Sequence, residues 1–168
     1  MWRMVLAAML LSACAWAQNP VSDALRDDLP RMQKNTIGAA EEMPADKYGY
    51  KPTDAQVPFG HWVSHATGAN NFICAKLTGA TPPDAGVKET DPKDKLVEAL
   101  KKSFDYCTEQ LPKLQDSQLG EEIEWFGGRK MTKGAGALAL SADWADHYSQ
   151  MASYLRLNGL LPPTAKKK

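Results

Sequence analysis

The sequence predicts an all-α domain built as a four-helix bundle. Four stretches carry apolar residues three and four positions apart, which is the spacing of one face of a helix. The segments between them are rich in glycine and proline, and none shows a convincing alternation of apolar and polar residues that would indicate a strand. The chain of 168 residues is long enough for one domain with a substantial core. Four helices in one such domain are most simply arranged as a bundle.

The first expected helix covers residues 19–43 and is followed by an irregular connection. A proline suits its first turn, and Pro30 in its interior is expected to kink it. The connection, residues 45–58, is punctuated by glycine and proline, so we expect a loop. We expect its two aromatic residues, Tyr48 and Tyr50, to cover an edge of the core rather than to bind a ligand.

The second expected helix, residues 57–77, has a well-defined apolar face. His65 falls at the flank of this face, and His61 lies further round toward solvent. Asn70 lies near the apolar face, where a buried amide needs hydrogen-bond partners. The residues expected to face the core are Phe59, Trp62, Val63, Ala66, Ala69, Ile73 and Leu77.

The third expected helix covers residues 93–111 and starts after an Asp-Pro pair. Before it, residues 78–92 are rich in glycine, proline and aspartate and are expected to form a surface loop. After it, residues 114–131 form a second irregular stretch, in which residues 123–128 fit either a short strand-like piece or a turn. The inward positions of this helix are Leu96, Val97, Leu100, Phe104, Cys107 and Leu111.

The fourth expected helix begins at Lys130 or Thr132 and ends at Asn158. Asn158 and Gly159 form a good C-terminal cap, because the left-handed conformation that ends a helix costs little only for glycine or asparagine. A Pro-Pro pair soon afterwards prevents continuation. The core side of this helix carries Ala137, Leu140, Trp144, Tyr148, Met151, Tyr154 and Leu155.

The N-terminus has the features of an export signal. A positively charged start with Arg3 precedes an apolar stretch, residues 5–11, that is too short to span a membrane. Two cleavage sites compete: an Ala-x-Ala site that ends at Ala17, and a lipobox that would make Cys14 a lipid-anchored N-terminus. We therefore expect an exported protein, either periplasmic or secreted in soluble form, or anchored to a membrane as a lipoprotein.

Three segments follow from these boundaries. We expect a signal peptide over residues 1–17 (1–13 in a lipoprotein), the helical bundle over residues 18–163, and a disordered basic tail over residues 164–168. The 20 basic and 20 acidic side chains give no net charge, which argues against nucleic acid as the main partner.

Two cysteines, Cys74 and Cys107, remain in the exported chain. An even number of cysteines in an oxidising compartment favours a disulfide, and such a bridge would contribute about 3–4 kcal/mol in the chain-entropy model. Two buried free thiols are the alternative. If the cysteines are bridged, neither can act as a catalytic thiol.

Three side chains form a candidate metal site. Asp143 and His147 are four residues apart and therefore share one face of the fourth helix. With His65 they supply two imidazoles and a carboxylate, a set that binds Zn, Fe, Mn or Ni when other coordination positions stay open. The simpler alternative is that His147 is a hydrogen-bonded bundle residue and Asp143 a surface charge. His61 is a reserve ligand, since it forms an i, i+4 pair with His65. No hydrolase nucleophile motif and no phosphate- or dinucleotide-binding glycine pattern is present.

Three segments of the chain resemble the DinB-like (DinB/YfiT) superfamily of metal-dependent bundle proteins, in an exported bacterial form. They are residues 47–53 (KYGYKPT), residues 59–65 (FGHWVSH), and residues 147–159 (HYSQMASYLRLNG) with the Pro-Pro pair that follows. The resemblance implies helices in up-down-down-up order. It also implies a metal held by one histidine of the second helix and a His-x-x-x-His pair of the fourth.

The resemblance assigns His65 and His147 to two ligand positions. Asp143 takes the third, where the family usually has histidine, and this departure puts the choice and the strength of metal binding in question. The implied function is that of a metal-dependent hydrolase or a thiol-dependent transferase acting on an unidentified small molecule, with association as a homodimer left open. The alternative is a non-catalytic envelope module, binding a small ligand or associated with stress, whose metal site has degenerated.

Overall fold

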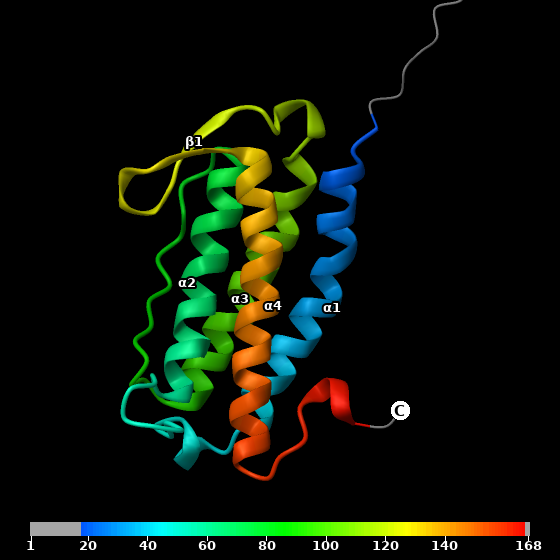
Figure 1. Cartoon of the computed structure of the whole chain (residues 1–168). Helices are drawn as coiled ribbons and strands as arrows, with labels where there is room; N and C mark the ends of the chain where they lie inside the picture. Colours follow the sequence, from blue (N-terminus) through cyan, green and yellow to red (C-terminus); the bar gives the residue numbers. More distant parts are fainter. Residues whose placement is uncertain (1–17, 167–168) are drawn as a thin grey trace, which may run out of the picture.

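The computed structural model describes residues 18–166, and these form the predicted all-α four-helix bundle (Figure 1). The predicted signal segment with Cys14 and the last two lysines lie outside the described residues. No helix within residues 18–166 is long and apolar enough to cross a membrane. The four helices are α1 (Pro20–Glu42), α2 (Phe59–Thr78), α3 (Lys93–Gln110) and α4 (Lys133–Leu157).

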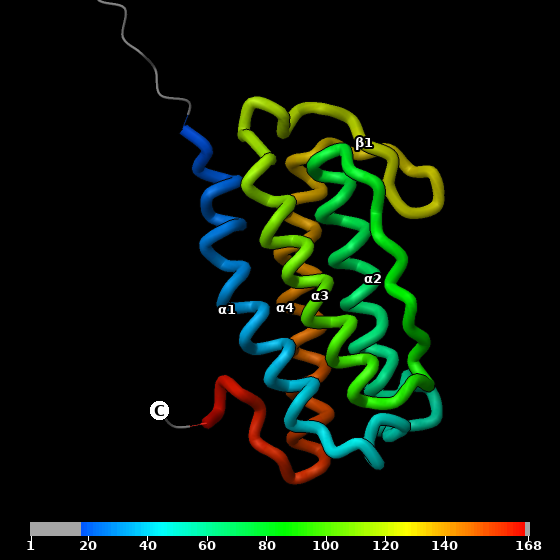
Figure 2. The backbone as a smooth tube through the Cα atoms, turned by 180° about the vertical axis from the view of Figure 1, so that it is seen from behind, coloured from blue at the N-terminus to red at the C-terminus, as the bar shows by residue number. Residues whose placement is uncertain are grey.

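The helices follow the up-down-down-up order that the family resemblance implies. α2 and α3 run in the same direction, whereas α1 and α4 run opposite to them (Figures 1 and 2). Two parallel neighbours need a long return connection, and residues 79–92 supply it by running the length of the bundle along its outside. α2 packs against both α3 and α4, and α1 packs against α4 and, less extensively, α3.

The apolar faces predicted from helical spacing form the core. Every residue expected to point inward from the second, third and fourth helices is buried, except Trp62 and Tyr148, which are partly buried. Tyr48 closes one end of the core as expected: its hydroxyl donates to the carbonyl of Ala40 over 2.7 Å, and its ring contacts Phe59 edge-on. Burial of this hydroxyl raises its pKa above the usual range of tyrosine.

The helix that carries Asp143 and His147 has well-defined ends. At its start the Thr132 hydroxyl accepts a hydrogen bond from a first-turn amide over 3.2 Å. At its end Gly159 adopts a φ of 72°, and its amide donates to the carbonyl of Arg156. The next amide, that of Leu160, donates to Leu155, which completes the two-bond stop that a left-handed glycine permits.

Both ends of α1 are held by side chains from distant parts of the chain. The Asp116 carboxylate accepts hydrogen bonds from two amides of the first turn and from the Ser22 hydroxyl, over 2.6–2.9 Å. At the other end the Lys93 ammonium donates to the carbonyls of Glu41 and Met43, over 2.6 and 2.8 Å. These contacts satisfy backbone groups that a helix leaves unpaired at its termini. The helix continues through Pro30 as one element.

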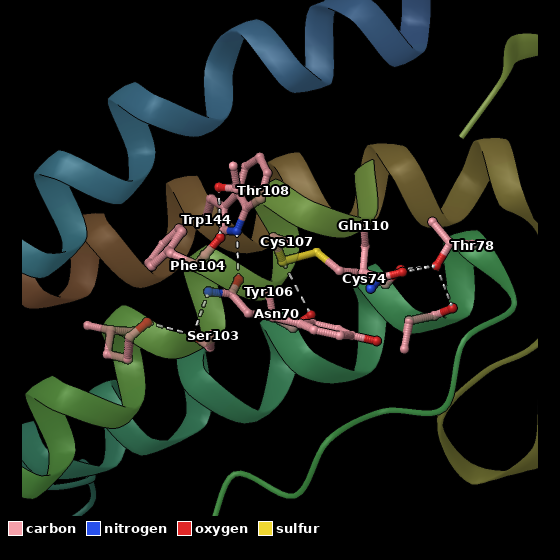
Figure 3. Close-up of a disulfide and its surroundings, with 12 residues drawn as sticks. Asn70, Cys74, Thr78, Ser103, Phe104, Tyr106, Cys107, Thr108, Gln110 and Trp144 are labelled. Atoms are coloured by element: carbon pink, nitrogen blue, oxygen red, sulfur yellow. Dashed lines mark hydrogen bonds between the residues drawn. A yellow bond between two sulfur atoms is a disulfide. The ribbon is translucent and has the colours of Figure 1, made fainter. Parts of the chain in front are cut away.

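Cys74 and Cys107 form the predicted disulfide, which joins α2 to α3 in the interior (Figure 3). Their Cα atoms lie 5.4 Å apart, and both residues are completely buried. The predicted alternative of two free thiols is therefore excluded. The bridge lies beside the buried polar residue Asn70 (Figure 3).

Two short segments differ from the expected irregular structure. The sequence predicts an irregular stretch over residues 114–131, with a short strand-like piece or a turn at residues 123–128, but β1 (Glu122–Glu124) and β2 (Lys130–Thr132) pair as an antiparallel hairpin, with Ile123 opposite Met131. The C-terminal tail was expected to be disordered from residue 164. Instead Pro163–Ala165 form a 3₁₀ turn against α1, the Thr164 and Tyr148 hydroxyls hydrogen-bond over 2.7 Å, and Lys166 pairs with Glu42.

Candidate metal centre

The structure brings His65, Asp143 and His147 together on adjacent helices. Each offers one ligand atom, and these atoms all lie within 4.8 Å of one another. His65 comes from α2, whereas Asp143 and His147 come from one face of α4 because they are one helical turn apart. The cluster extends from the interior of the bundle to its surface. His147 is 4% exposed, Asp143 is partly buried, and His65 is exposed.

Two of these ligand atoms are close together without forming a hydrogen bond. Nδ1 of His147 and Oδ2 of Asp143 are 3.0 Å apart. Both atoms are buried, yet neither has a hydrogen-bond partner among the described residues. The two atoms are within ion-pair distance when His147 is protonated, but they do not meet the angular requirement of a hydrogen bond. In the tautomer that leaves the Nδ1 lone pair of His147 free, this nitrogen and the Asp143 carboxylate are two buried acceptors, which a shared cation stabilises.

A metal ion fits this pair. Ligand atoms that bind one ion at about 2.0–2.2 Å each lie roughly 3 Å or slightly more from one another. An imidazole nitrogen and a carboxylate oxygen are both common ligands of Zn²⁺, Fe²⁺, Mn²⁺ and Ni²⁺. The orphaned atoms of His147 and Asp143 therefore suit a divalent metal, and His65 is close enough to supply a third ligand.

The two histidine rings contact each other, and the ring of His147 also contacts Trp62. The His65 and His147 rings meet edge to face, with centroids 4.9 Å apart, and the Trp62 ring lies 5.8 Å from that of His147. Partial burial is the main cause that lowers the pKa of His65 below its usual value of 6.5, and the neighbouring His147 is the second. His65 is thus biased toward the neutral form that binds metals.

His61, the reserve ligand of the sequence prediction, lies beside the cluster rather than in it. Its ring stacks on that of His65, with centroids 5.5 Å apart, and its Nδ1 lies 2.8 Å from Oε2 of Glu89. Glu89 belongs to the crossover loop, which packs tightly here: a methyl group added at Gly60 would lie 2.4 Å from the Glu89 carbonyl oxygen. His61 therefore pairs with the Glu89 carboxylate of the loop and lies outside the ligand cluster.

Two neighbours of the site were missed by sequence reasoning. Glu89 lies in a segment without periodicity, so no sequence signal connects it with His61. Trp62 was predicted only as a core residue, although it follows His61 directly and contacts the ring of His147. Its indole Nε1 is buried without a hydrogen-bond partner among the described residues.

Comparison with known proteins identifies the family. A family profile described as the DinB superfamily matches residues 28–151, which is well over half of the chain. The protein belongs to the DinB superfamily. No curated protein is significantly similar to the chain.

Solved structures share the DinB-like fold. A DinB-like protein from Bacillus subtilis is 23% identical, with a TM-score of 0.68, covering 86% of this chain and 99% of the other. A DinB-like protein from Bacillus cereus is 16% identical, with a TM-score of 0.67 and coverage of 84% and 95%. A conserved protein from Enterococcus faecalis is 14% identical, with a TM-score of 0.63 and coverage of 82% and 96%. At these identities the likeness establishes the fold alone.

Proposed function

We propose that this DinB-superfamily protein binds one divalent metal ion through His65, Asp143 and His147. The observation that carries the proposal is the buried pair of Nδ1 of His147 and Oδ2 of Asp143, 3.0 Å apart and without hydrogen-bond partners among the described residues. Leaving two such atoms unpaired costs free energy, and a bound cation removes that cost. Family membership and the convergence of the three side chains support the same conclusion.

The reaction class that this site favours is metal-dependent hydrolysis or thiol-dependent transfer on a small molecule. A bound divalent metal supplies acidified water or thiol, or polarises a substrate oxygen. His147 and His65 differ in their exposure and therefore in the role each would have. His147 is buried against Trp62, whereas His65 is exposed and lies on the side from which a substrate would reach the centre.

A second candidate function is non-catalytic binding of a small ligand. A cavity of about 620 Å³ lies between α3 and the crossover loop, which is in the usual size range of ligand sites. Asn71, Ser103 and Tyr106 are among its lining residues, and none of the three cluster residues is. A protein that binds its ligand in this cavity would not need a metal. Asp143, where the family usually has histidine, would then belong to a metal site that has degenerated.

We also propose that the protein is exported. The buried disulfide suits an oxidising compartment, and the N-terminal segment has the charge and the apolar stretch of a signal peptide. Fractionation of cells that express the wild type and Cys14→Ala distinguishes the forms. A lipoprotein pellets with membranes only when Cys14 is present, a soluble exported protein is released in both cases, and retention of both in the cytoplasm contradicts export.

Elemental analysis of the natively purified protein tests the metal proposal. We expect close to one equivalent of a divalent metal in the wild type and its loss in His147→Ala. His61→Ala is the matched control, because His61 is also a histidine beside the site but pairs with Glu89, so this variant should keep its metal. Wild-type protein that is free of metal and takes up none on titration would contradict the proposal and favour the cavity-based alternative.

A further inference from the structure

Asn70 is the centre of a buried polar network that connects three helices (Figure 3). It lies on α2 and is completely buried. Its Oδ1 accepts a hydrogen bond of 2.8 Å from Nε1 of Trp144 on α4, and its Nδ2 donates to Oγ of Ser103 on α3 over 3.0 Å. Ser103 in turn donates to the carbonyl of Leu100. The Cys107 sulfur of the disulfide lies 3.5 Å from the Asn70 carbonyl oxygen.

The α4 partner in this network lies between two of the candidate metal ligands. Trp144 directly follows Asp143 and is three residues before His147. On α2, Asn70 is five residues after His65. Since α2 and α4 run in opposite directions, the Asn70–Trp144 hydrogen bond and the ligand cluster belong to adjacent layers of one helix interface.

We propose that Asn70 is a positioning residue for the metal centre: through Trp144 it fixes α4 against α2 so that Asp143 and His147 meet His65. The inference rests on the proposed metal-binding function and deepens it. A slide of one residue along a helix moves the backbone by about 1.5 Å and a rotation by one residue turns it by about 100°. Either change moves Asp143 and His147 together relative to His65 on α2, and so disturbs a cluster whose ligand atoms lie within 4.8 Å of one another.

Apolar contacts alone fix such an arrangement poorly. The buried apolar residues of α2 around Asn70 are small or aliphatic, including Ala66, Ala69 and Ile73. Side chains of this kind pack acceptably in more than one register, whereas a buried asparagine with directed hydrogen bonds is satisfied in only one. Two other polar residues of this stretch are buried, but neither links α2 to α4: Thr67 bonds to the Val63 carbonyl of its own helix, and Asn71 donates to the Pro83 carbonyl of the crossover loop.

Titration with Co²⁺ tests the inference, because the visible absorption of Co²⁺ reports coordination geometry as well as affinity. The variants are Asn70→Leu, which removes the centre of the network, and Trp144→Phe, which keeps an aromatic ring but removes the donor. Thr67→Val is the matched control, since it deletes a buried hydroxyl of α2 that joins no two helices. Thermal unfolding measures the stability of each variant in parallel.

We expect Asn70→Leu and Trp144→Phe to bind Co²⁺ at least about tenfold more weakly than the wild type, with an altered absorption band, as is usual when support of metal ligands is lost. Thr67→Val should bind as the wild type does. Wild-type affinity and spectrum in a folded Asn70→Leu or Trp144→Phe protein would overturn the inference. If Asn70→Leu does not fold, the Co²⁺ affinity and spectrum of Trp144→Phe alone test the inference. A wild type that binds no Co²⁺ overturns the metal proposal itself, and the inference with it.

Discussion

Replacing Cys74 and Cys107 by alanine should lower the free energy of unfolding by about 3–4 kcal/mol. The bridged residues are 33 positions apart, and closing a loop of that length in the unfolded chain accounts for a value in this range. In the unfolded chain the bond keeps this whole loop closed, and without the bond the loop is free to expand. Both positions are completely buried, and alanine introduces no unpaired polar group there.

Urea unfolding followed by far-ultraviolet circular dichroism measures this effect on the double variant, the oxidised wild type and the wild type in reductant. For a domain of this size 1 kcal/mol corresponds to about 2–4 °C, so we expect the melting temperature to fall by roughly 10 °C. The dependence of the unfolding free energy on urea should steepen, because a less constrained unfolded chain exposes more surface. A loss below about 1 kcal/mol, with unchanged urea dependence, would refute the chain-entropy reasoning.

Three further predictions concern single positions. Asp143→His should raise the affinity for Zn²⁺ relative to Mn²⁺ by about tenfold, because imidazole suits Zn²⁺ better than a carboxylate does; competition titration measures the ratio, and an unchanged ratio contradicts Asp143 as a ligand. Asp116→Asn should remove an acid-sensitive contribution to stability: burial raises the pKa of Asp116, but hydrogen bonds from Ser22 and from the α1 amides outweigh it and hold the pKa below 3.8. The wild type therefore has this contribution above pH 3.8 and loses it as the pH falls further, so the melting temperatures of wild type and variant should converge in acid, whereas a constant gap would exclude this origin. Gly159→Ala should destabilise by about 1 kcal/mol because its φ is 72°, while Gly68→Ala, inside α2 with open space around it, should stabilise by about 0.5–1 kcal/mol; chemical unfolding that gives the same sign for both would refute the argument.

The helices could be predicted closely because each of them carries its own local signals. Helical spacing on α2, α3 and α4 identified the buried faces, and Gly159 marked the end of α4 correctly. The predicted ends of the helices are wrong by only a few residues, at positions where the sequence has no clear capping signal. The start of the second helix was placed at residue 57, for example, whereas Pro58 precedes its first turn.

Contacts made between distant segments could not be predicted in the same way. The hairpin of β1 and β2 has only three residues in each strand, too few to show an alternating pattern. Asp116 caps α1 from nearly a hundred residues away, which no local capping rule detects. A basic chain end is predicted to be disordered by default, but Lys166 pairs with the carboxylate of Glu42 on α1.

In the candidate site, too, local spacing could be predicted and contacts between distant segments could not. Asp143 and His147 could be paired from their spacing on one helix, and the helical phase placed His65 at the edge of the core, where it meets them. The role of Glu89 could not be predicted, since it depends on the path of the crossover loop past His61. Asn70 was expected to need partners, but spacing alone could not reveal that one of them is Trp144.

Anomalous diffraction from a crystal of the natively purified, metal-loaded protein tests the proposed function most directly. Data collected at the absorption edge of the metal found by elemental analysis should show one peak at the cluster. We expect a nitrogen of His65, a nitrogen of His147 and an oxygen of Asp143 within about 2.0–2.3 Å of that peak. A peak at another place, or no peak between His147 and Asp143, would contradict the assignment of these residues as metal ligands.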